Sequence, residues 1–214
     1  MAKTKPFDNY LNEYEQWFIE NYFVYLSELE AVRKLIPPEG KGVEVGIGSG
    51  LFASPLGIKH GCDPSETMRQ KATERGINAI YGIAEDLPYE NNYFDFVLMV
   101  TTICFVDDPD RAFSEISRIL KPEGELIIGF IDKNSPVGKQ YSKHKKESVF
   151  YRDATFYSTQ EIYGLLVKNG FVIEDTLQTV FGKLNEVKEI QHPDQGSGEG
   201  CFVVIKAKKS FEMF

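Results

Sequence analysis

Residues 43–50 read Val43-Glu44-Val45-Gly46-Ile47-Gly48-Ser49-Gly50, a short apolar run that passes into glycines at alternate positions. Glycine allows a sharp turn at the end of a strand and leaves no Cβ between the backbone and a ligand. The run therefore predicts a β-strand with a ligand site at its carboxyl end. A dinucleotide turn, G-x-G-x-x-G, would need glycine at position 51, where the chain has Leu51, and no Gly-Lys-Ser/Thr of a P-loop follows.

Strand-like and helix-like segments alternate on both sides of this turn. Strands are expected near 42–46, 58–62, 78–81, 94–100 and 125–131, and helices near 50–56, 65–75 and 108–120. The capping sequence Ser158-x-x-Glu161 predicts a further helix, followed by strands over 171–180 and 201–207. Apolar side chains at helical spacing predict an amphipathic helix from residue 8 to 35 with a break near Asn21. This alternation is typical of an α/β protein with a mainly parallel sheet and helices on both faces.

Composition limits the partners of the chain. Its 214 residues are 42% hydrophobic and 26% charged, as in globular proteins, and the formal net charge of -8 argues against nucleic acid. Three cysteines lie far apart without a C-x-x-C pair, which fits a reducing compartment and predicts no metal site. The first residues lack the apolar core of a signal peptide, and no segment is apolar enough to span a membrane. A cytoplasmic location without a membrane partner is expected.

Polar groups follow the next two predicted strands. Asp63 ends the strand near 58–62, beside the glycine turn, and its two oxygens can accept hydrogen bonds from both hydroxyls of a ribose. Asp63 could instead cap the helix that begins near Pro64, and the two roles can coexist. After the third strand, a backbone N–H and a polar side chain of Gly82-Ile83-Ala84-Glu85-Asp86 could meet an adenine edge.

These segments, with Phe94-Asp95-Phe96-Val97 and Arg118-Ile119-Leu120-Lys121-Pro122-Glu123-Gly124 downstream, resemble the class I S-adenosylmethionine-dependent methyltransferases. The chain is most similar to the small-molecule branch that includes ubiquinone and menaquinone C-methyltransferases. The resemblance implies S-adenosyl-L-methionine as cofactor and a small-molecule methyl acceptor. It also implies a Rossmann-like seven-stranded sheet in the order 3-2-1-4-5-7-6, with the last strand antiparallel. The acceptor atom, N, O, C or S, stays open.

The resemblance further implies a set of cofactor contacts. They are Glu44 under the methionine end; Gly46, Gly48 and Gly50 around the cofactor; Asp63 at the ribose; Pro64 as a further cofactor contact; Met68, Ala84 and Glu85 at the adenine; and Thr101, with Thr102, beside the methyl group. Glu85 stands in for an aspartate that relatives carry at Ile83, and it is interpreted equally well as a solvated loop acid. Many relatives also carry a histidine where this chain has Ile103-Cys104-Phe105-Val106, so no catalytic base is assigned.

Aromatic side chains are candidates for the acceptor pocket. They are Tyr14 and Trp17 near the amino end, and Phe105, Tyr141, Phe150, Tyr151 and Phe156 further along. Aromatic residues at helical spacing usually pack in a core, which is the alternative for the first two. The group would suit an aromatic acceptor or one that carries a cation.

The chain is expected to form one domain over 1–214. Its parts are a helical cap (1–38), a cofactor-binding core (39–132), a lid insertion (133–157), and a closing helix and strands (158–214). Two other functions remain open from the sequence. One is a ligand-binding or partner module without turnover, which the missing histidine permits. The other is a nicotinamide-dependent oxidoreductase, which Leu51 disfavours. The oligomeric state is not predicted.

Overall fold

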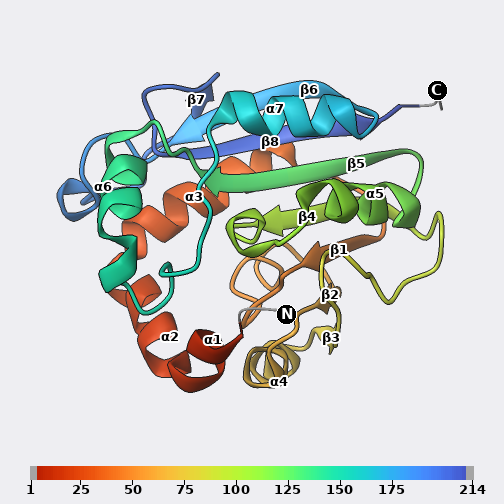
Figure 1. Ribbon diagram of the computed structural model, residues 1–214, viewed down its shortest axis with the longest axis horizontal. Helices are drawn as coiled ribbons and strands as arrows, with labels where there is room; N and C mark the ends of the chain where they lie inside the picture. Colours follow the sequence, from red (N-terminus) through yellow and green to blue (C-terminus); the bar gives the residue numbers. More distant parts are fainter. Residues whose placement is uncertain (1–3, 211–214) are drawn as a thin grey trace.

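The computed structural model describes residues 4–210, so the first three residues of the expected cap and the last four of the chain lie outside it. Its centre is an eight-stranded sheet in the order β3-β2-β1-β4-β5-β8-β6-β7 (Figure 1). The strands are β1 (Gly42–Val45), β2 (His60–Cys62), β3 (Asn78–Ile80), β4 (Phe94–Val100), β5 (Leu120–Ile131), β6 (Phe171–Thr179), β7 (Asp194–Gln195) and β8 (Phe202–Lys209). Strands β1 to β5 pair in parallel, and β8 is antiparallel to both β5 and β6.

The expected fold is confirmed, with one difference in the sheet. The order of the seven expected strands is as predicted, because β6 and β8 are the sixth and seventh of them. The additional strand, β7, is a two-residue segment that pairs with the edge of β6. It is too short, and too polar, to produce an alternating pattern in the sequence.

Helices cover both faces of the sheet (Figure 1). On one face, α5 (Pro109–Ile119) and α7 (Thr159–Lys168) pack on side chains such as Val97 and Met99. On the other, α3 (Tyr22–Leu35) and α4 (Glu66–Glu74) pack on side chains such as Leu98 and Val100. Successive residues of a strand point to opposite faces, which is why the apolar run of β4 serves both layers.

Three helices lie beyond the tips of the parallel strands, at the left in Figure 1. They are α1 (Lys5–Asn9), α2 (Leu11–Glu20) and α6 (Pro136–His144). The predicted break at Asn21 is confirmed, since α2 ends at Glu20 and α3 begins at Tyr22. There Asn21 leaves the helical conformation, with a φ of -107° and a ψ of 40°, and both its backbone N–H and its side-chain amide donate to the Trp17 carbonyl oxygen (2.9 Å each).

The prediction of a helix near 50–56 is wrong. Residues 51–57 form consecutive turns instead. Pro55 has no N–H to donate, and Gly57 has a φ of 75°, a left-handed conformation that ends a helical turn. The segment passes directly from the glycine turn to the approach of β2.

The start of α7 confirms the predicted capping sequence. The Ser158 hydroxyl accepts a hydrogen bond from Glu161 N (3.3 Å), and the Glu161 carboxylate accepts one from Ser158 N (2.7 Å). Ser158→Ala is expected to lower the free energy of unfolding by about 1 kcal/mol, the usual cost of losing a helix cap. Urea unfolding measures it, with Ser142→Ala as control, because Ser142 is exposed and lies within α6 rather than at a helix start. An unchanged midpoint would show that the cap does not support the helix.

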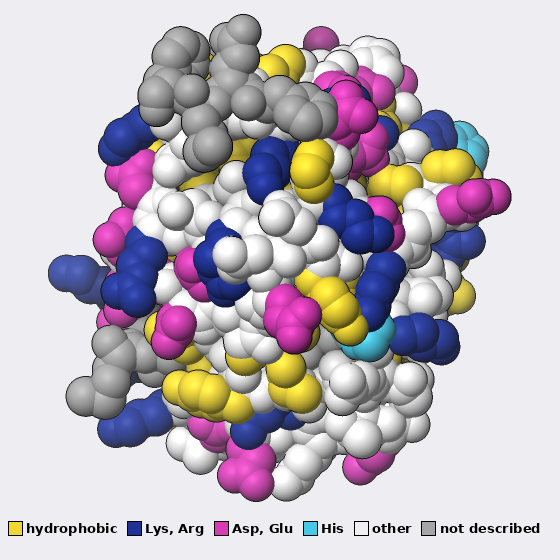
Figure 2. Space-filling model, turned by 90° about the vertical axis from the view of Figure 1, so that its right-hand side faces the viewer, with side chains coloured by type: hydrophobic (Ala, Val, Ile, Leu, Met, Phe, Trp, Pro, Cys, Tyr) yellow, Lys and Arg dark blue, Asp and Glu magenta, His cyan; other side chains and the backbone are white. Residues whose placement is uncertain are grey.

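The face of the molecule from which β4 and β5 begin carries charges of both signs. Lys and Arg side chains are interspersed there with Asp and Glu, and hydrophobic side chains lie singly or in small groups (Figure 2). No helix within residues 4–210 has the length and apolar character needed to cross a bilayer.

Candidate active site

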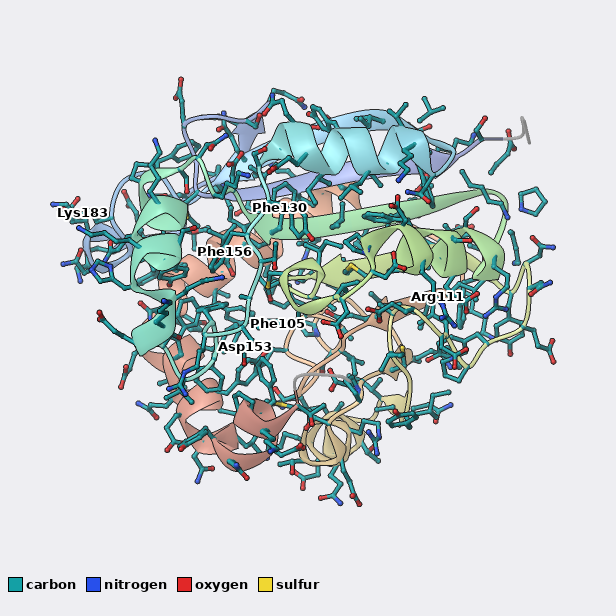
Figure 3. All side chains as sticks on the ribbon, in the orientation of Figure 1. Phe105, Arg111, Phe130, Asp153, Phe156 and Lys183 are labelled. Atoms are coloured by element: carbon teal, nitrogen blue, oxygen red, sulfur yellow. The ribbon has the colours of Figure 1, made fainter. Side chains whose placement is uncertain are left out.

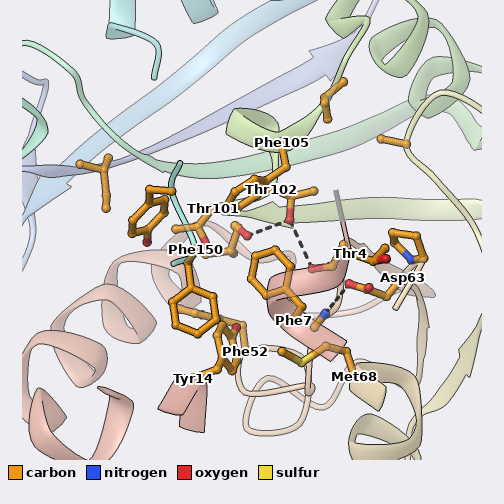
Figure 4. Close-up of a pocket in the computed structure, with 18 of the residues that line it drawn as sticks. Thr4, Phe7, Tyr14, Phe52, Asp63, Met68, Thr101, Thr102, Phe105 and Phe150 are labelled. Carbon is orange, nitrogen blue, oxygen red and sulfur yellow. Dashed lines mark hydrogen bonds between the residues drawn. The ribbon is translucent and has the colours of Figure 1, made fainter. Parts of the chain in front are cut away.

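A cavity of about 290 Å³ lies beyond the carboxyl ends of the parallel strands, where open α/β sheets bind their ligands. The segments after β1, β2, β3 and β4 form its floor, and side chains from α1, α2, α3 and α6 close it (Figure 4). Of the predicted cofactor residues, the ones that line it are Gly46, Gly48, Asp63, Pro64, Met68, Ala84, Glu85 and Thr101. The structure thus brings together residues that are far apart in the sequence.

The three glycines of the turn have different surroundings. All have positive φ values, 70° at Gly46, 52° at Gly48 and 83° at Gly50. A Cβ on Gly46 would overlap Thr102, and one on Gly50 would meet Ile77 and the backbone of α4. A Cβ on Gly48 would point into the cavity, with only the Tyr14 hydroxyl nearby at 3.2 Å. Gly48 therefore leaves room for a ligand against the backbone, whereas Gly50, outside the cavity lining, leaves room for α4.

Glu44 lies beneath the turn and does not line the cavity. Its side chain is buried, and one carboxyl oxygen, Oε2, has no hydrogen-bond partner among the described residues. Burial raises the pKa of this carboxyl well above its ordinary value, although a hydrogen bond from the Ala53 N–H lowers it. An orphaned buried oxygen of this kind is a position for a water or a ligand donor.

Asp63 faces the same part of the cavity from the end of β2. One of its carboxyl oxygens accepts from Gly48 N (2.9 Å) and the other from Ser65 N (2.8 Å). Burial raises the pKa of Asp63 to about 6, while these two backbone hydrogen bonds lower it. Each oxygen retains a lone pair for a further donor. Ser65, not Asp63, caps α4, because its hydroxyl accepts from Met68 N (3.2 Å).

The loop after β3 supplies the wall next to Asp63. Ala84 and Glu85 both line the cavity. The Glu85 carboxylate, however, accepts hydrogen bonds from the backbone N–H groups of Asp107 (2.8 Å) and Asp108 (3.2 Å). Glu85 thereby joins this loop to the segment that precedes α5, and its expected contact with adenine stays a prediction.

Backbone strain marks the end of β4. Thr101 has a φ of 48°, which is rare for a β-branched residue, and its N–H donates to the Gly129 carbonyl oxygen (2.8 Å). Thr101 and Thr102 line the cavity, and the Thr102 hydroxyl donates to the Gly46 carbonyl oxygen (3.2 Å). Thr101 thus connects the end of β4 to β5, and Thr102 next to it connects β4 to the glycine turn at the centre of the site.

Aromatic rings form the other end of the cavity (Figure 4). The predicted residues that line it are Tyr14, Trp17, Phe105, Tyr141, Phe150 and Tyr151. Phe156 does not reach this cavity. It lines a smaller one, of about 10 Å³, together with Phe130 (Figure 3) and Tyr151.

Phe7 of α1 is an aromatic residue that the sequence analysis missed. Its ring lies within the cavity between the cofactor residues and the aromatic end (Figure 4). The ring centroid is 5.2 Å from that of Phe105 and 5.6 Å from that of Phe150. The sequence indicates this short helix only through Pro6 at its start, because five residues are too few for a periodic pattern.

Two polar contacts hold α1 and α2 against the cavity. The Glu15 carboxylate pairs with Arg75 (2.5 Å) and also accepts from the Ser49 hydroxyl of the glycine turn. The Asp8 carboxylate accepts from the Ser65 hydroxyl (2.5 Å) at the start of α4. Neither α1 nor α2 has a fully buried residue, so these contacts and the aromatic rings account for their position.

The charges that line the cavity are all acidic. Among the described residues, no Lys, Arg or His lines it, and the acidic residues are Glu13, Glu28, Asp63, Glu85 and Asp107. Glu28 was not predicted, although the sequence holds a signal. It interrupts an apolar stripe of α3 in which Val24, Ala31 and Leu35 are buried at helical spacing.

Relatives of the chain cover almost all of its length. A family model described as a methyltransferase domain matches residues 43–128. A Thermotoga maritima crystal structure, described as a SAM-dependent methyltransferase and possible histamine N-methyltransferase, is 50% identical with a TM-score of 0.94, covering 97% of this chain and all of that one. An uncharacterized protein of Methanocaldococcus jannaschii is 42% identical over 95% of this chain and 98% of its own length. Phosphoethanolamine N-methyltransferase 2 of Caenorhabditis elegans is 31% identical over 93% of this chain and 49% of its own length.

The chain belongs to the class I S-adenosylmethionine-dependent methyltransferases. Its cofactor is S-adenosylmethionine, and the open space over Gly48, next to the Asp63 carboxylate, fits such a group. Similarity to ubiquinone and menaquinone C-methyltransferases is confirmed as a distant one. The comparisons give no support to a nicotinamide enzyme. In residues 4–210, no group of three or more His, Cys, Asp or Glu side chains could hold a metal ion.

Proposed function

We propose that this protein transfers the methyl group of S-adenosylmethionine to a nitrogen atom of a small-molecule amine. The observation that carries the proposal is the charge of the cavity, which has five acidic residues and, in the described part of the chain, no basic one. Carboxylates and aromatic rings attract cations and disfavour phosphates and carboxylates. An amine acceptor agrees with the names of two relatives, a possible histamine N-methyltransferase and a phosphoethanolamine N-methyltransferase.

The charge of the cavity also narrows the class of amines that we propose as acceptors. The phosphate of a phosphorylated amine is best bound by Lys or Arg side chains, which pair with it through charge-assisted hydrogen bonds. No basic side chain of the described residues lines the cavity, and the lining of the aromatic end is apolar apart from hydroxyl, thiol and carboxyl groups. We therefore propose an acceptor without phosphate, unlike the one in the name of the C. elegans relative.

In this proposal the cofactor supplies an electrophilic methyl group, and the protein binds the cofactor and aligns the acceptor with it. Gly46 and Gly48 let the cofactor lie on the backbone, Asp63 accepts hydrogen bonds from its ribose hydroxyls, and Ala84 contacts the adenine. Glu44 supports the methionine end from beneath through its free oxygen. The residues 133–157, proposed as a lid, contribute Tyr141, Phe150 and Tyr151, which exclude water around the acceptor.

An amine needs little further help from the protein. Its neutral nitrogen already has a lone pair, so alignment with the S–CH₃ bond is the main requirement, and the proton of the product can leave to solvent. This agrees with the segment Ile103–Phe105, which has no histidine at the position where many relatives carry one. A carbon acceptor would need a base to remove a proton, and no such residue is assigned.

A labelled-methyl assay over amines, phenols, quinones and thiols tests the proposal. Label is expected in amines without phosphate and not in the other classes. Transfer to phenols, quinones or thiols alone would overturn the nitrogen assignment. Silence over the whole panel despite tight S-adenosylhomocysteine binding would favour a module without turnover.

Asp63→Ala is expected to weaken S-adenosylhomocysteine binding by about 1–3 kcal/mol, because charge-assisted hydrogen bonds to the ribose are lost. Calorimetry measures the affinity. Glu66→Ala, which removes an exposed carboxylate three positions along the chain, is the control and should bind as the wild type does. Equal affinity of the Asp63→Ala variant and the wild type would remove the ribose assignment.

A further inference from the structure

Glu28 is a buried carboxylate at the aromatic end of the cavity. Its side chain is only 5% exposed, it lines the cavity, and no hydrogen bond or ion pair joins it to another described residue. Buried carboxylates in folded proteins are almost always paired, because the charge loses its hydration. Without a partner the carboxyl keeps its proton in the free protein, and a cationic group that enters the cavity can take the place of that proton.

The groups around Glu28 bring no positive charge. Those that face it are Tyr141 of α6, Tyr151 of the loop after α6, and Cys201 just before β8. Burial raises the pKa of each of them, to about 12 for Tyr141, so that all three stay neutral at physiological pH. The Tyr141 and Tyr151 rings are stacked, with centroids 5.2 Å apart. A carboxylate beside aromatic rings is the arrangement that binds organic ammonium groups.

This subsite lies away from the cofactor residues. Cys201, one of the groups around Glu28, directly precedes β8, and three strands, β1, β4 and β5, separate β8 from β2, which ends beside Asp63. Besides burial, Tyr14 and Glu28 both contribute to the raised pKa of Tyr151, so Tyr151 lies near each of them and joins the two ends of the cavity. A cation on Glu28 therefore lies apart from the expected cofactor residues, and an ammonium nitrogen has no lone pair with which to accept the methyl group.

We infer that Glu28, Tyr141 and Tyr151 bind a protonated amine of the acceptor while a second, neutral nitrogen of the same molecule receives the methyl group. The inference rests on the proposed amine methylation and specifies its substrate class, a small molecule with an ammonium group and a separate uncharged nitrogen. A charged and an uncharged nitrogen coexist in one molecule when the two nitrogens differ in basicity. An imidazole loses its proton near pH 6.5 and an alkylammonium near pH 10.4, on the scale of histidine and lysine.

The test compares acceptors that differ only in the ammonium group. Histamine and 4-methylimidazole share the ring, and both rings are largely neutral at about pH 8.5, but only histamine carries the charged arm. Glu28→Gln is expected to raise the KM for histamine about 10- to 100-fold, the scale of losing a charged hydrogen bond, and to leave kcat nearly unchanged. The KM for 4-methylimidazole should not change. Glu30→Gln, on the same helix but outside the cavity lining, is the matched control.

Each remaining outcome decides the inference. Equal increases of KM for both acceptors, or none for histamine, would overturn the ammonium site. If the wild type methylates no amine, the proposed function fails, and calorimetry of the protein loaded with S-adenosylhomocysteine then tests the subsite with 1,3-diaminopropane. Binding that Glu28→Gln weakens about 10- to 100-fold would support it, whereas equal binding by both proteins, or binding by neither, would overturn it.

Discussion

Glu28→Gln is expected to raise the free energy of unfolding by roughly 3 kcal/mol at pH 7. The physical cause is burial, which raises the pKa of Glu28 from 4.5 to about 8. At about 1.4 kcal/mol per pKa unit, the interval between 4.5 and pH 7 corresponds to roughly 3 kcal/mol. Glutamine resembles the protonated carboxyl in size and polarity, and it has no proton to lose.

The sign of the pH dependence follows from proton binding. Between pH 4.5 and about 8 the folded protein keeps the Glu28 proton, whereas the unfolded chain has lost it. The contribution of Glu28 to stability therefore falls as pH rises through this window. Urea unfolding of both proteins at about pH 5, 7 and 9 should show a difference that is small at the lowest pH and full at the highest.

Glu39→Gln is the control for this measurement, because Glu39 follows the same helix, is exposed, and has no ion pair or hydrogen bond with another described residue. Its pH profile should run parallel to that of the wild type. A Glu28→Gln variant whose advantage does not grow with pH would show that Glu28 is ionised and paired in the folded protein. A carboxylate that costs stability is retained in proteins chiefly where function needs it.

Gly48→Ala is expected to weaken S-adenosylhomocysteine binding about 100-fold, or about 2.8 kcal/mol at 1.4 kcal/mol per tenfold. The new methyl group would project into the cavity, 3.2 Å from the Tyr14 hydroxyl, where the cofactor would lie against the backbone. The φ of 52° adds about 1 kcal/mol of strain in the folded state. Calorimetry measures the affinity and urea unfolding the stability.

Gly57→Ala separates the two effects. Gly57 has a φ of 75° and no atom within 4 Å of an added Cβ, so it has the backbone strain without the obstruction. Both variants should lose similar stability, and only Gly48→Ala should lose affinity. If the two variants bind S-adenosylhomocysteine equally well, the glycine turn is not the cofactor site.

The sequence predicted the sheet because its signals are local and strong. The apolar run Phe94–Val100 is buried along nearly its whole length, and the Ser158 cap is a short-range pattern. The floor of the cavity was predictable for the same reason, since parallel strands bring their carboxyl ends to one edge. The prediction of a helix near 50–56 is wrong because the spacing of apolar residues carries no information about the N–H that Pro55 lacks.

The closing wall of the cavity was less predictable, because it depends on contacts between distant residues. Phe7 meets Phe105 and Phe150, and nothing in a five-residue helix indicates those partners. Glu28 looked like one of many acids in an amphipathic helix, and only the packing of α3 shows that it is buried. Gly50 and Phe156 match the expected patterns, yet they pack next to the cavity without lining it.

The distance in sequence between the amino-terminal helices and their partners has a consequence for synthesis on the ribosome. The Glu15 carboxylate accepts a hydrogen bond from Arg75, which is 60 residues later in the chain. The Ser27 hydroxyl accepts one from Gln191 N, 164 residues later. At about 5–20 residues per second, the second interval is roughly 10–30 seconds of translation. Throughout it, Ser27 lacks this partner, so the packing of α3 against the segment near Gln191 can be completed only after nearly all of the chain has been made.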